Sequence, residues 1–336
     1  MDFSNKQIGD YLKQLTDALI PYQFVHLTGL PLIEKICQEF NLPKPQVIGG
    51  NIIIGDLSSK LILVSHLDEI SFGIKKIAQD GCYLALYHNY EDNNGLKLKI
   101  IGIREKEVQI IGDGVLEDQN GELFCKTSAP IKMGDRVVYN FGAEINGDLI
   151  TAKTIDGRAG VLAQLLAASE LFKQRKDIAV IFTEGEEGDP KGYFARNFAR
   201  VLPLIPKDSL ICFTYGVYPN ERQNSENKNP PKEAFIIPHS SHGKGYIVNP
   251  MRFAWLRDEI IPKALERGVK LEISETYSSR ADDWALTTNQ NTTFEPEAFF
   301  VDFGSFGRGH HQVPMTIDIN TIKNVAETII LIGEQI

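Results

Sequence analysis

Apolar residues recur at helical spacing at the start of the chain. In residues 6–18 (KQIGDYLKQLTDA) and 31–40 (PLIEKICQEF), apolar side chains stand three and four positions apart, which is the pattern of an amphipathic helix. Two short β-branched runs follow at 51–56 and 60–69. They predict two strands joined by a tight turn, the second of which ends at His66.

The pattern changes between about residues 73 and 150. This stretch consists of short alternating segments such as LKLKIIGI and VQIIGDGVL, separated by NNG, DQNG and NGD turns, with no helical period. Segments of this kind predict antiparallel strands joined by hairpins. We therefore expect a small all-β, barrel-like domain at residues 73–149.

Helical and strand patterns alternate in the rest of the chain. Helices are predicted at 157–174, 190–202, 251–267 and 319–335, and strands at 177–183, 210–215 and 270–276. Strands alternating with helices of this length predict an α/β sheet with helices on both faces. We therefore predict one α/β domain, residues 1–72 plus 150–336, that is interrupted by the β domain. A polar stretch near 218–232 with paired prolines predicts a long mobile loop.

Composition and charge narrow the function classes. With 43% hydrophobic and 24% charged residues among 336, the chain is typical of a soluble globular protein with a substantial core. Its net charge of −9 and lack of a basic run argue against a nucleic-acid partner. No apolar run of about 18 residues occurs, and the polar start does not match a secretory signal. We expect a cytoplasmic protein without a membrane partner.

The four cysteines are far apart and form no CxxC pair. Neither a disulfide framework nor a thiolate zinc site is indicated by this spacing. We expect all four to be reduced.

Histidines and carboxylates gather where strands are predicted to end. The set is His66, Asp68, Asp156, Glu184, Glu186, Glu187, His310 and His311. In an open α/β sheet, functional groups collect beyond the carboxyl ends of the strands. Imidazoles and carboxylates together suit a divalent metal, zinc above all, with cobalt and manganese as alternatives.

Each of these residues also has a purely structural interpretation. A lone histidine at a strand end is more often a hydrogen-bonded core group, and an Asp before Gly, as at Asp156, is usually a turn residue. Adjacent glutamates are commonest on a solvated face. The joint order of the signals favours a metal site, because four independent weak signals seldom coincide at four strand ends.

Hydrolytic chemistry explains why such a set is useful. Two cations about 3.5 to 4 Å apart, bridged by a carboxylate, polarise a carbonyl and lower the pKa of a water between them. A further carboxylate must accept that water's proton. In the pair Glu186–Glu187 the first residue can be this base and the second a ligand. Asp68, two residues after His66, is placed to orient the imidazole.

Six segments spread over nearly the whole chain carry a family resemblance. They are SHLDEISFGI, GDRVVYNFGAEINGDLITAKTIDGRAG, FTEGEEGDPKGY, GKGY, SRADDWAL and GRGHHQVPMTIDI. Together they resemble the cytosolic co-catalytic metallo-aminopeptidases of the glutamyl aminopeptidase and tetrahedral aminopeptidase family, some of whose members were once labelled endoglucanases. The resemblance implies a zinc-aminopeptidase-like catalytic domain, with the β insertion as an oligomerisation domain.

The resemblance also implies a role for each matching residue. The implied roles are Asp156 as bridging ligand, His66 on one metal, Glu187 and His311 on the other, Glu186 as general base, and Asp68 as a supporting group. The metal position built from His66 and Asp156 lacks a third protein ligand. We therefore expect a strong and a weak metal site, with one or two ions per chain.

The missing ligand is a departure from the family pattern. The family has an Asp at the end of the next strand, where this chain has Thr214 followed by Tyr215, and neither neutral side chain is a good ligand. Candidates by type to fill the gap or contact substrate are Thr214, Tyr215, His239, His242, Asp282 and Asp283. Gly157, Met315 and the run Gly188-Asp189-Pro190 also replace family residues.

Three functions remain open at this point. The leading hypothesis is a metal-dependent aminopeptidase that hydrolyses N-terminal residues of short peptides, with Glu186 activating the water. A related deacylase with one metal is the nearest enzymatic alternative, because the lost Asp affects recognition of a free amine. The third is a non-catalytic protein that keeps a remnant metal site. In each case we expect a homo-oligomer formed through the β domain.

Overall fold

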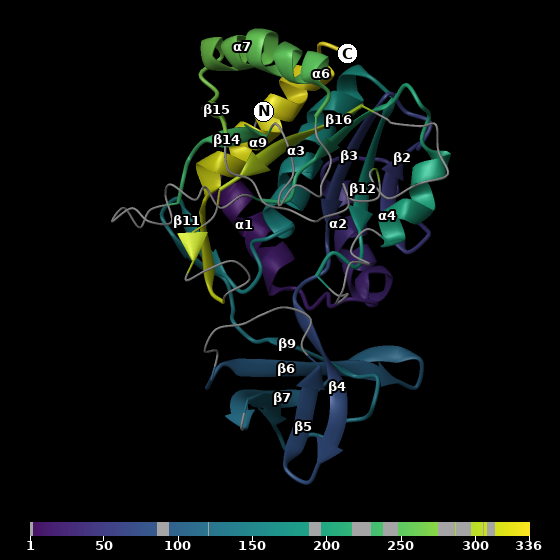
Figure 1. The fold of residues 1–336 in the computed structure, drawn as a ribbon, viewed down its shortest axis with the longest axis vertical. Helices are drawn as coiled ribbons and strands as arrows, with labels where there is room; N and C mark the ends of the chain where they lie inside the picture. Colours follow the sequence, from purple (N-terminus) through teal and green to yellow (C-terminus); the bar gives the residue numbers. More distant parts are fainter. Residues whose placement is uncertain are drawn as a thin grey trace.

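The computed structural model divides the chain into an α/β part and a β-barrel, and Figure 1 shows the barrel below the α/β part. The structure describes residues 3–85, 94–119, 121–187, 196–216, 230–237, 248–274, 286, 297–304, 306–307 and 313–336. Among these residues no helix is both long and apolar enough to cross a membrane.

An eight-stranded sheet forms the centre of the α/β part. Its strands are β1 (Gln46–Ile48), β2 (Asn51–Gly55), β3 (Leu61–His66), β12 (Ile178–Thr183), β13 (Leu210–Phe213), β14 (Ala234–Ile237), β15 (Leu271–Ile273) and β16 (Glu297–Phe303). They are arranged in the order β1-β2-β12-β3-β13-β16-β14-β15. The four central strands, β12, β3, β13 and β16, run parallel. β3 and β12 are buried at every position, as expected for parallel strands covered on both faces.

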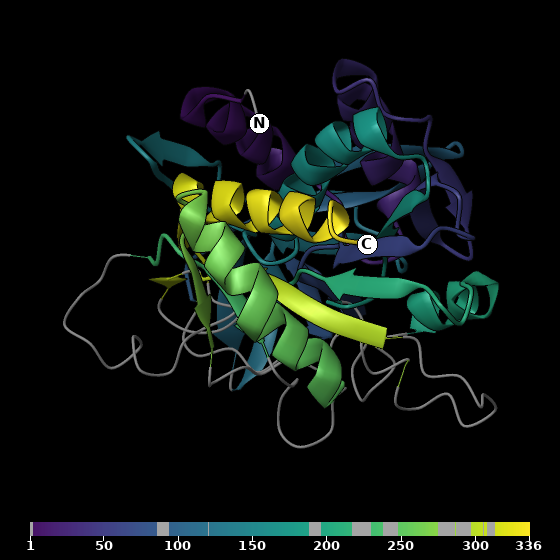
Figure 2. The same ribbon diagram turned by 90° about the horizontal axis from the view of Figure 1, so that it is seen from above.

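Helices cover both faces of this sheet. They are α1 (Asn5–Asp17), α2 (Leu30–Glu39), α3 (Arg158–Gln174), α4 (Arg196–Val201), α6 (Pro250–Trp255), α7 (Ile261–Glu266) and α9 (Ile319–Gly333), with π-helical turns η1 (Val25–Gly29) and η3 (Leu256–Ile260) and the 3₁₀ turn η2 (Leu202–Leu204). In Figure 2, α3 and α9 lie on one side of the sheet and α4 on the other. The predicted mixed α/β class is therefore confirmed.

Local sequence signals explain where these helices begin. Ser4 and Gln7 form a capping box at the start of α1, in which each side chain accepts a hydrogen bond from the other residue's backbone N–H, and this satisfies two otherwise unpaired donors. The Asp318 carboxylate likewise accepts from the Asn320 N–H at the start of α9. α3 has no side-chain cap and is buried along most of its length.

The β insertion is a closed barrel. Its strands are β4 (Ser71–Ala78), β5 (Gly81–Ala85), β6 (Lys97–Arg104), β7 (Glu107–Gln119), β8 (Glu122–Lys126) and β9 (Arg136–Tyr139). Phe72, Leu98, Leu116 and Val137 belong to its core, which is separate from the core of the α/β part. The predicted barrel-like domain is thus confirmed.

A small sheet lies where the chain leaves the barrel. It consists of β10 (Glu144–Asn146), β11 (Leu149–Ala152), β17 (Phe306–Gly307) and β18 (Met315–Asp318). β11 pairs with β18, which leads into α9. The residues just before position 150 therefore pair with the C-terminal part of the chain rather than with the barrel.

Several predicted elements differ in detail from the observed ones. The helix expected at 251–267 is present as α6, η3 and α7 in succession, and β1 and β14 had no clear signal in the sequence. The helix expected at 190–202 is described only from Arg196 onward, and most of the loop expected at 218–232 lies outside the described residues. The four cysteines are free and buried, as predicted.

Candidate metal centre

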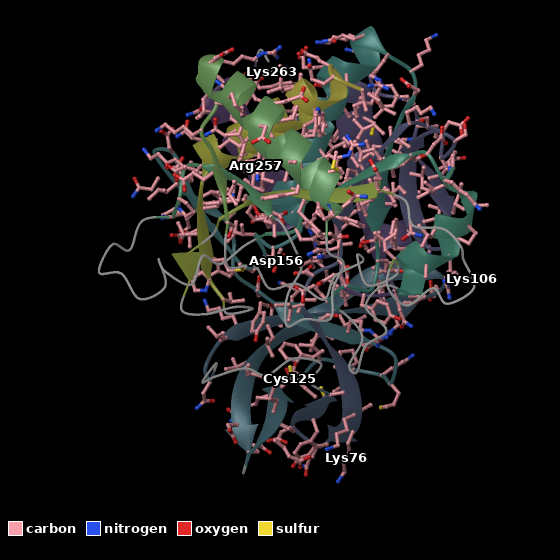
Figure 3. The ribbon with its side chains drawn as sticks, turned by 45° about the horizontal axis from the view of Figure 1, so that its top comes forward. Lys76, Lys106, Cys125, Asp156, Arg257 and Lys263 are labelled. Carbon is pink, nitrogen blue, oxygen red and sulfur yellow. The ribbon has the colours of Figure 1, made fainter. Side chains whose placement is uncertain are left out.

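Parallel strand ends bring the candidate ligands to one edge of the sheet. Thr183, the last residue of β12, pairs in register with His66, the last residue of β3, so the glutamates that follow β12 emerge beside the histidine. Asp156 lies between β11 and α3, just before the helix begins. Figure 3 labels Asp156 between the sheet and the barrel.

Four of the predicted residues form a compact cluster, which we call the acidic cluster: His66, Asp156, Glu186 and Glu187. His66 Nε2 lies 3.2 Å from Asp156 Oδ1 and 3.9 Å from Glu186 Oε2. One donor atom each from His66, Asp156 and Glu187 lies within 4.8 Å of the other two. The side chains of Asp156 and Glu186 keep 13% and 16% of their exposure, so solvent and ligands can reach the cluster.

The donor set fits a divalent metal ion. Zinc binds imidazole nitrogen and carboxylate oxygen at about 2.0 to 2.2 Å, so two donors at a tetrahedral zinc lie roughly 3.3 Å apart. The 3.2 Å between His66 Nε2 and Asp156 Oδ1 agrees with this spacing. Three protein ligands that leave a position open are also the usual arrangement of catalytic zinc sites.

Asp68 connects the two ends of this cluster. His66 Nδ1 lies 3.2 Å from the backbone oxygen of Asp68 and 3.7 Å from its carboxylate. An Nδ1–H therefore donates to the backbone oxygen, which leaves Nε2, on the side of Asp156, as the ring nitrogen that a cation can use. The Asp68 carboxylate accepts a hydrogen bond of 3.0 Å from the Glu187 N–H. The structure thus shows Asp68 holding the Glu187 backbone as well as facing His66.

The electrostatics of the cluster favour an added cation. Burial raises the pKa of Glu187 well above its usual range, and the carboxylates of Glu186 and Asp156 raise it further. Burial alone would lower the pKa of His66, but Glu186, Asp156 and Asp68 together raise it well above its usual value. Both shifts show an excess of negative charge with little solvent to screen it.

The strand end without an Asp is occupied by an aromatic ring. The Tyr215 ring stacks on the His66 imidazole, with 5.6 Å between ring centroids and an interplanar angle of 10°. Thr214 is buried, and its hydroxyl lies beside the Cys212 thiol. Of the two residues at this position, Tyr215 therefore contacts the acidic cluster.

Some predicted site residues cannot be placed. His239, His242, Asp282, Asp283, His310 and His311, together with Gly188-Asp189-Pro190, lie outside the described residues. Among the residues that the structure does describe, it brings together His66, Asp68, Asp156, Glu186, Glu187 and Tyr215.

A second group of buried charges adjoins the acidic cluster, and we call it the ion-pair cluster: Glu69, Lys153 and Arg158. Lys153 Nζ lies 2.5 Å from Glu69 Oε2, and Arg158 Nη2 lies 3.9 Å from Glu69 Oε1. All three side chains are at most 2% exposed. These residues carry no separate signal in the sequence, although they lie within the segments SHLDEISFGI and GDRVVYNFGAEINGDLITAKTIDGRAG.

Glu184, one of the predicted strand-end carboxylates, points to a different place. Its Oε1 accepts from the Val25 N–H at 3.0 Å and its Oε2 from Asn197 Nδ2 at 3.3 Å. It lines a small polar cavity of about 220 Å³ with Tyr22, Gln23, Asn197 and Arg200. Burial raises the pKa of Glu184 to about 7.

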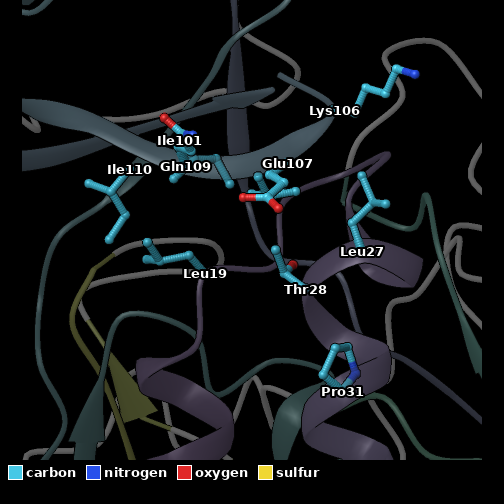
Figure 4. Close-up of a pocket in the computed structure, with 10 residues that line it drawn as sticks. Leu19, Leu27, Thr28, Pro31, Ile101, Lys106, Glu107, Gln109 and Ile110 are labelled. Carbon is cyan, nitrogen blue, oxygen red and sulfur yellow. The ribbon is translucent and has the colours of Figure 1, made fainter. Parts of the chain in front are cut away.

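A larger cavity of about 640 Å³ lies elsewhere, between the turn that joins β6 to β7 and the segment formed by η1 and α2 (Figure 4). Its lining includes Leu19, Leu27, Pro31, Glu107 and Ile110. None of the acidic-cluster residues lines it, so the larger cavity is not the metal centre.

Solved structures share this fold over their full length. A TET aminopeptidase from the archaeon Thaumarchaeota archaeon SCGC AB-539-E09 superposes with a TM-score of 0.78, covering 99% of this chain and 98% of that chain at 15% identity. An aminopeptidase from the archaeon Desulfurococcus kamchatkensis superposes with a TM-score of 0.76, covering 99% and 96% at 17% identity. The chain has the fold of these aminopeptidases.

A third similar structure belongs to a peptidase that forms large assemblies. The TET1 peptidase of Pyrococcus horikoshii, which can assemble into a tetrahedron or a large octahedral shell, has a TM-score of 0.75 and 17% identity, covering 97% of this chain and 99% of that chain. No protein-family model and no curated protein matches the sequence. The resemblance inferred from the motifs is therefore confirmed in the fold.

Proposed function

We propose that the protein is a metal-dependent aminopeptidase that hydrolyses N-terminal residues of short peptides. The observation that carries the proposal is the acidic cluster, in which three ligand-type side chains lie within 4.8 Å of one another with Glu186 beside them. The aminopeptidase fold of the similar structures supports the same function.

In this proposal His66, Asp156 and Glu187 hold the ion; the resemblance implies that His311 is a ligand on the Glu187 side of the site. A divalent cation in such a site polarises the peptide carbonyl and makes a bound water more acidic. Zinc suits the donors, and cobalt or manganese are alternatives.

Glu186 is the proposed general base. Its carboxylate lies 3.9 Å from His66 and retains some exposure, so it can contact a water at the metal centre. It takes a proton from the attacking water and delivers it to the leaving amine, which then departs as a neutral group. Asp68 keeps His66 and Glu187 in place through the contacts described above.

Substitution of the base tests this role. We expect Glu186→Gln to abolish hydrolysis of aminoacyl p-nitroanilides and short peptides, while zinc content measured by elemental analysis stays at the wild-type level. Glu122→Gln, which changes an exposed carboxylate in the barrel, is the matched control and should keep full activity. Retained turnover in Glu186→Gln would reject the assignment.

A deacylase is the second candidate, and a specific observation favours it. Tyr215 lies against His66 where the related family has a carboxylate, and recognition of a substrate's free amine depends on negative charge near the metals. A panel of N-acetylated and free-amine peptides of the same sequence separates the two functions. Hydrolysis of the acyl group alone would favour the deacylase.

We also propose a homo-oligomer formed through the barrel. Support comes from the shells formed by the Pyrococcus horikoshii peptidase and from large apolar side chains that the barrel exposes: Ile77, Ile103, Ile110, Val115 and Met133. Light scattering should give a multiple of the chain mass, and Ile110→Asp should lower it. A monomer at micromolar concentration would contradict this proposal.

The remaining expectations concern cellular context. We propose a cytoplasmic protein without nucleic-acid or membrane partners. The net charge of −9 argues against binding to phosphate backbones and to anionic lipids. Fractionation of cells that express the tagged chain tests the location.

A further inference from the structure

The His66 imidazole is enclosed on two sides. On one side the buried Tyr215 ring lies nearly parallel to it, 5.6 Å away between centroids. Both residues are at most 2% exposed, and offset stacking of aromatic rings favours this arrangement. The imidazole therefore cannot tilt toward Tyr215 without losing buried contact.

Gly157 closes a second approach to the ring. Its φ is +70°, a left-handed conformation that glycine tolerates and other residues rarely adopt. A Cβ at this position would lie 2.5 Å from His66 Cε1 and 2.6 Å from His66 Nε2. The ring thus fills the space that any side chain at position 157 would need.

The two ring nitrogens are also fixed. Nδ1 faces the backbone oxygen of Asp68 at 3.2 Å, and Nε2 faces Asp156 Oδ1 at 3.2 Å. Tyr215 lies against the face of the imidazole and Gly157 against its Cε1–Nε2 edge, so the ring is held in one orientation and Nε2 has one direction in which to coordinate a cation. That direction leads to the shared space between His66, Asp156 and Glu187.

A second ion would need further donors on the His66 side. Beside His66 the structure places Tyr215, whose ring stacks on the face of the imidazole, and Gly157, which has no side chain to offer as a ligand. Two neighbouring cations about 3.5 to 4 Å apart need a bridging carboxylate and additional ligands on each side. Among the described residues, those that can supply three donors to one ion are His66, Asp156 and Glu187.

We propose that Tyr215 is a positioning residue that directs the His66 imidazole toward a single cation, held jointly by His66, Asp156 and Glu187. The inference rests on the proposed function only in that the acidic cluster binds a divalent ion. Tyr215 and Gly157 occupy positions beside His66 from which a second ion would need ligands.

The wild-type protein provides the first test, with Mn²⁺ as the probe. After saturation and gel filtration, elemental analysis should give one ion per chain. Electron paramagnetic resonance should show the resolved hyperfine lines of an isolated Mn²⁺ rather than the broadened signal of two coupled ions. Two ions per chain with a coupled signal would overturn the proposal.

Substitutions at position 215 test the positioning role. Affinity for Zn²⁺ is measured by competition with a chromophoric chelator. Tyr215→Phe keeps the ring and should stay within about threefold of wild type, whereas Tyr215→Leu should bind at least about tenfold more weakly, as expected when a group that orients a ligand is lost. Equal affinity in Tyr215→Leu and wild type would also overturn the proposal.

A matched control separates positioning from general loss of packing. Tyr139 is buried in the barrel core and contacts Phe72 edge-on, so Tyr139→Leu removes a similar ring that is not part of the acidic cluster. It should leave Zn²⁺ affinity unchanged. If Tyr215→Leu does not fold, the ion count and the Mn²⁺ spectrum of the wild type still decide the question.

The outcomes also separate this inference from the proposed function. One bound ion without hydrolysis of any peptide would reject the aminopeptidase and keep the inference. Two bound ions with peptide hydrolysis would reject the inference and keep the aminopeptidase.

Discussion

Two adjacent groups of buried charges in this protein are neutralised in different ways. In the ion-pair cluster, Glu69 contacts Lys153 at 2.5 Å and lies 3.9 Å from Arg158, so the chain supplies its own cations. In the acidic cluster, the carboxylates of Asp156, Glu186 and Glu187 surround the single imidazole of His66. Among the residues that the structure describes, negative charge exceeds positive charge there.

This difference separates a structural role from a binding role. A buried carboxylate with a cationic partner contributes to the folded state, while removal of the partner leaves a charge that is costly to bury. In the acidic cluster the carboxylates raise one another's pKa around His66, so an added divalent cation relieves their mutual repulsion. Glu184 is neutralised in a third way: burial raises its pKa to about 7, so a proton can neutralise it.

The largest effect should come from breaking the ion-pair cluster. Lys153→Met leaves Glu69 buried with weaker compensation and should lower the free energy of unfolding by about 3 to 5 kcal/mol, measured by urea denaturation. Lys75 also lies 2.5 Å from a carboxylate, that of Glu122, but both side chains are more than half exposed. Lys75→Met should therefore cost less than about 1 kcal/mol. Equal losses in the two variants would show that the ion-pair cluster contributes no more to stability than an exposed ion pair.

The next largest effect is on how the free energy of unfolding depends on pH. The unfolded chain releases the Glu184 proton near pH 4.5, whereas the folded chain keeps it to about pH 7. The resulting stabilisation is complete below pH 4.5 and is lost as the pH rises through 7, by up to about 3 kcal/mol. Glu184→Gln should lack this loss between pH 5 and 8 in urea titrations with a chelator present. Parallel curves for variant and wild type would show that Glu184 is ionised throughout.

The smallest effect should follow substitution of Asp68, and it should appear in the affinity for Zn²⁺. Asp68→Asn weakens the acceptor for the Glu187 N–H and the negative charge beside His66, without removing a ligand. We expect a 10- to 100-fold loss of Zn²⁺ affinity, as found for groups that orient metal ligands, with an unchanged urea midpoint for the metal-free protein. Titration with a competing chelator measures it, and unchanged affinity would limit Asp68 to a packing role.

Strong periodic signals made most of the fold predictable. The apolar runs of β3 and β12 and the helical spacing of α1 and α9 are local features, and they appear where expected. β1 and β14 had no clear pattern: β1 is the first strand of a tight hairpin with β2, and β14 takes its place by pairing with β16, far along the chain. The π turn within the helix at 250–266 likewise has no signal in the sequence.

The metal centre was predictable in its residue types but not in its contacts. Strand ends marked His66, Asp156 and the two glutamates, because parallel strands bring their carboxyl ends together. The stacking of Tyr215 on His66 and the hydrogen bond from Glu187 to Asp68 depend on side-chain direction. The ion-pair cluster joins residues that are far apart along the chain, and each alone resembles an ordinary surface charge.

The contact between Glu69 and Lys153 also bears on how the insertion could have been acquired. One residue lies just before β4 and the other just after β11, so the chain departs for the barrel and comes back at nearly the same point. Closing a loop between fixed ends becomes harder only slowly as it lengthens, by about 0.6 kcal/mol for each doubling. Modules of quite different size can therefore be accommodated between these two anchors while the rest of the molecule keeps its architecture.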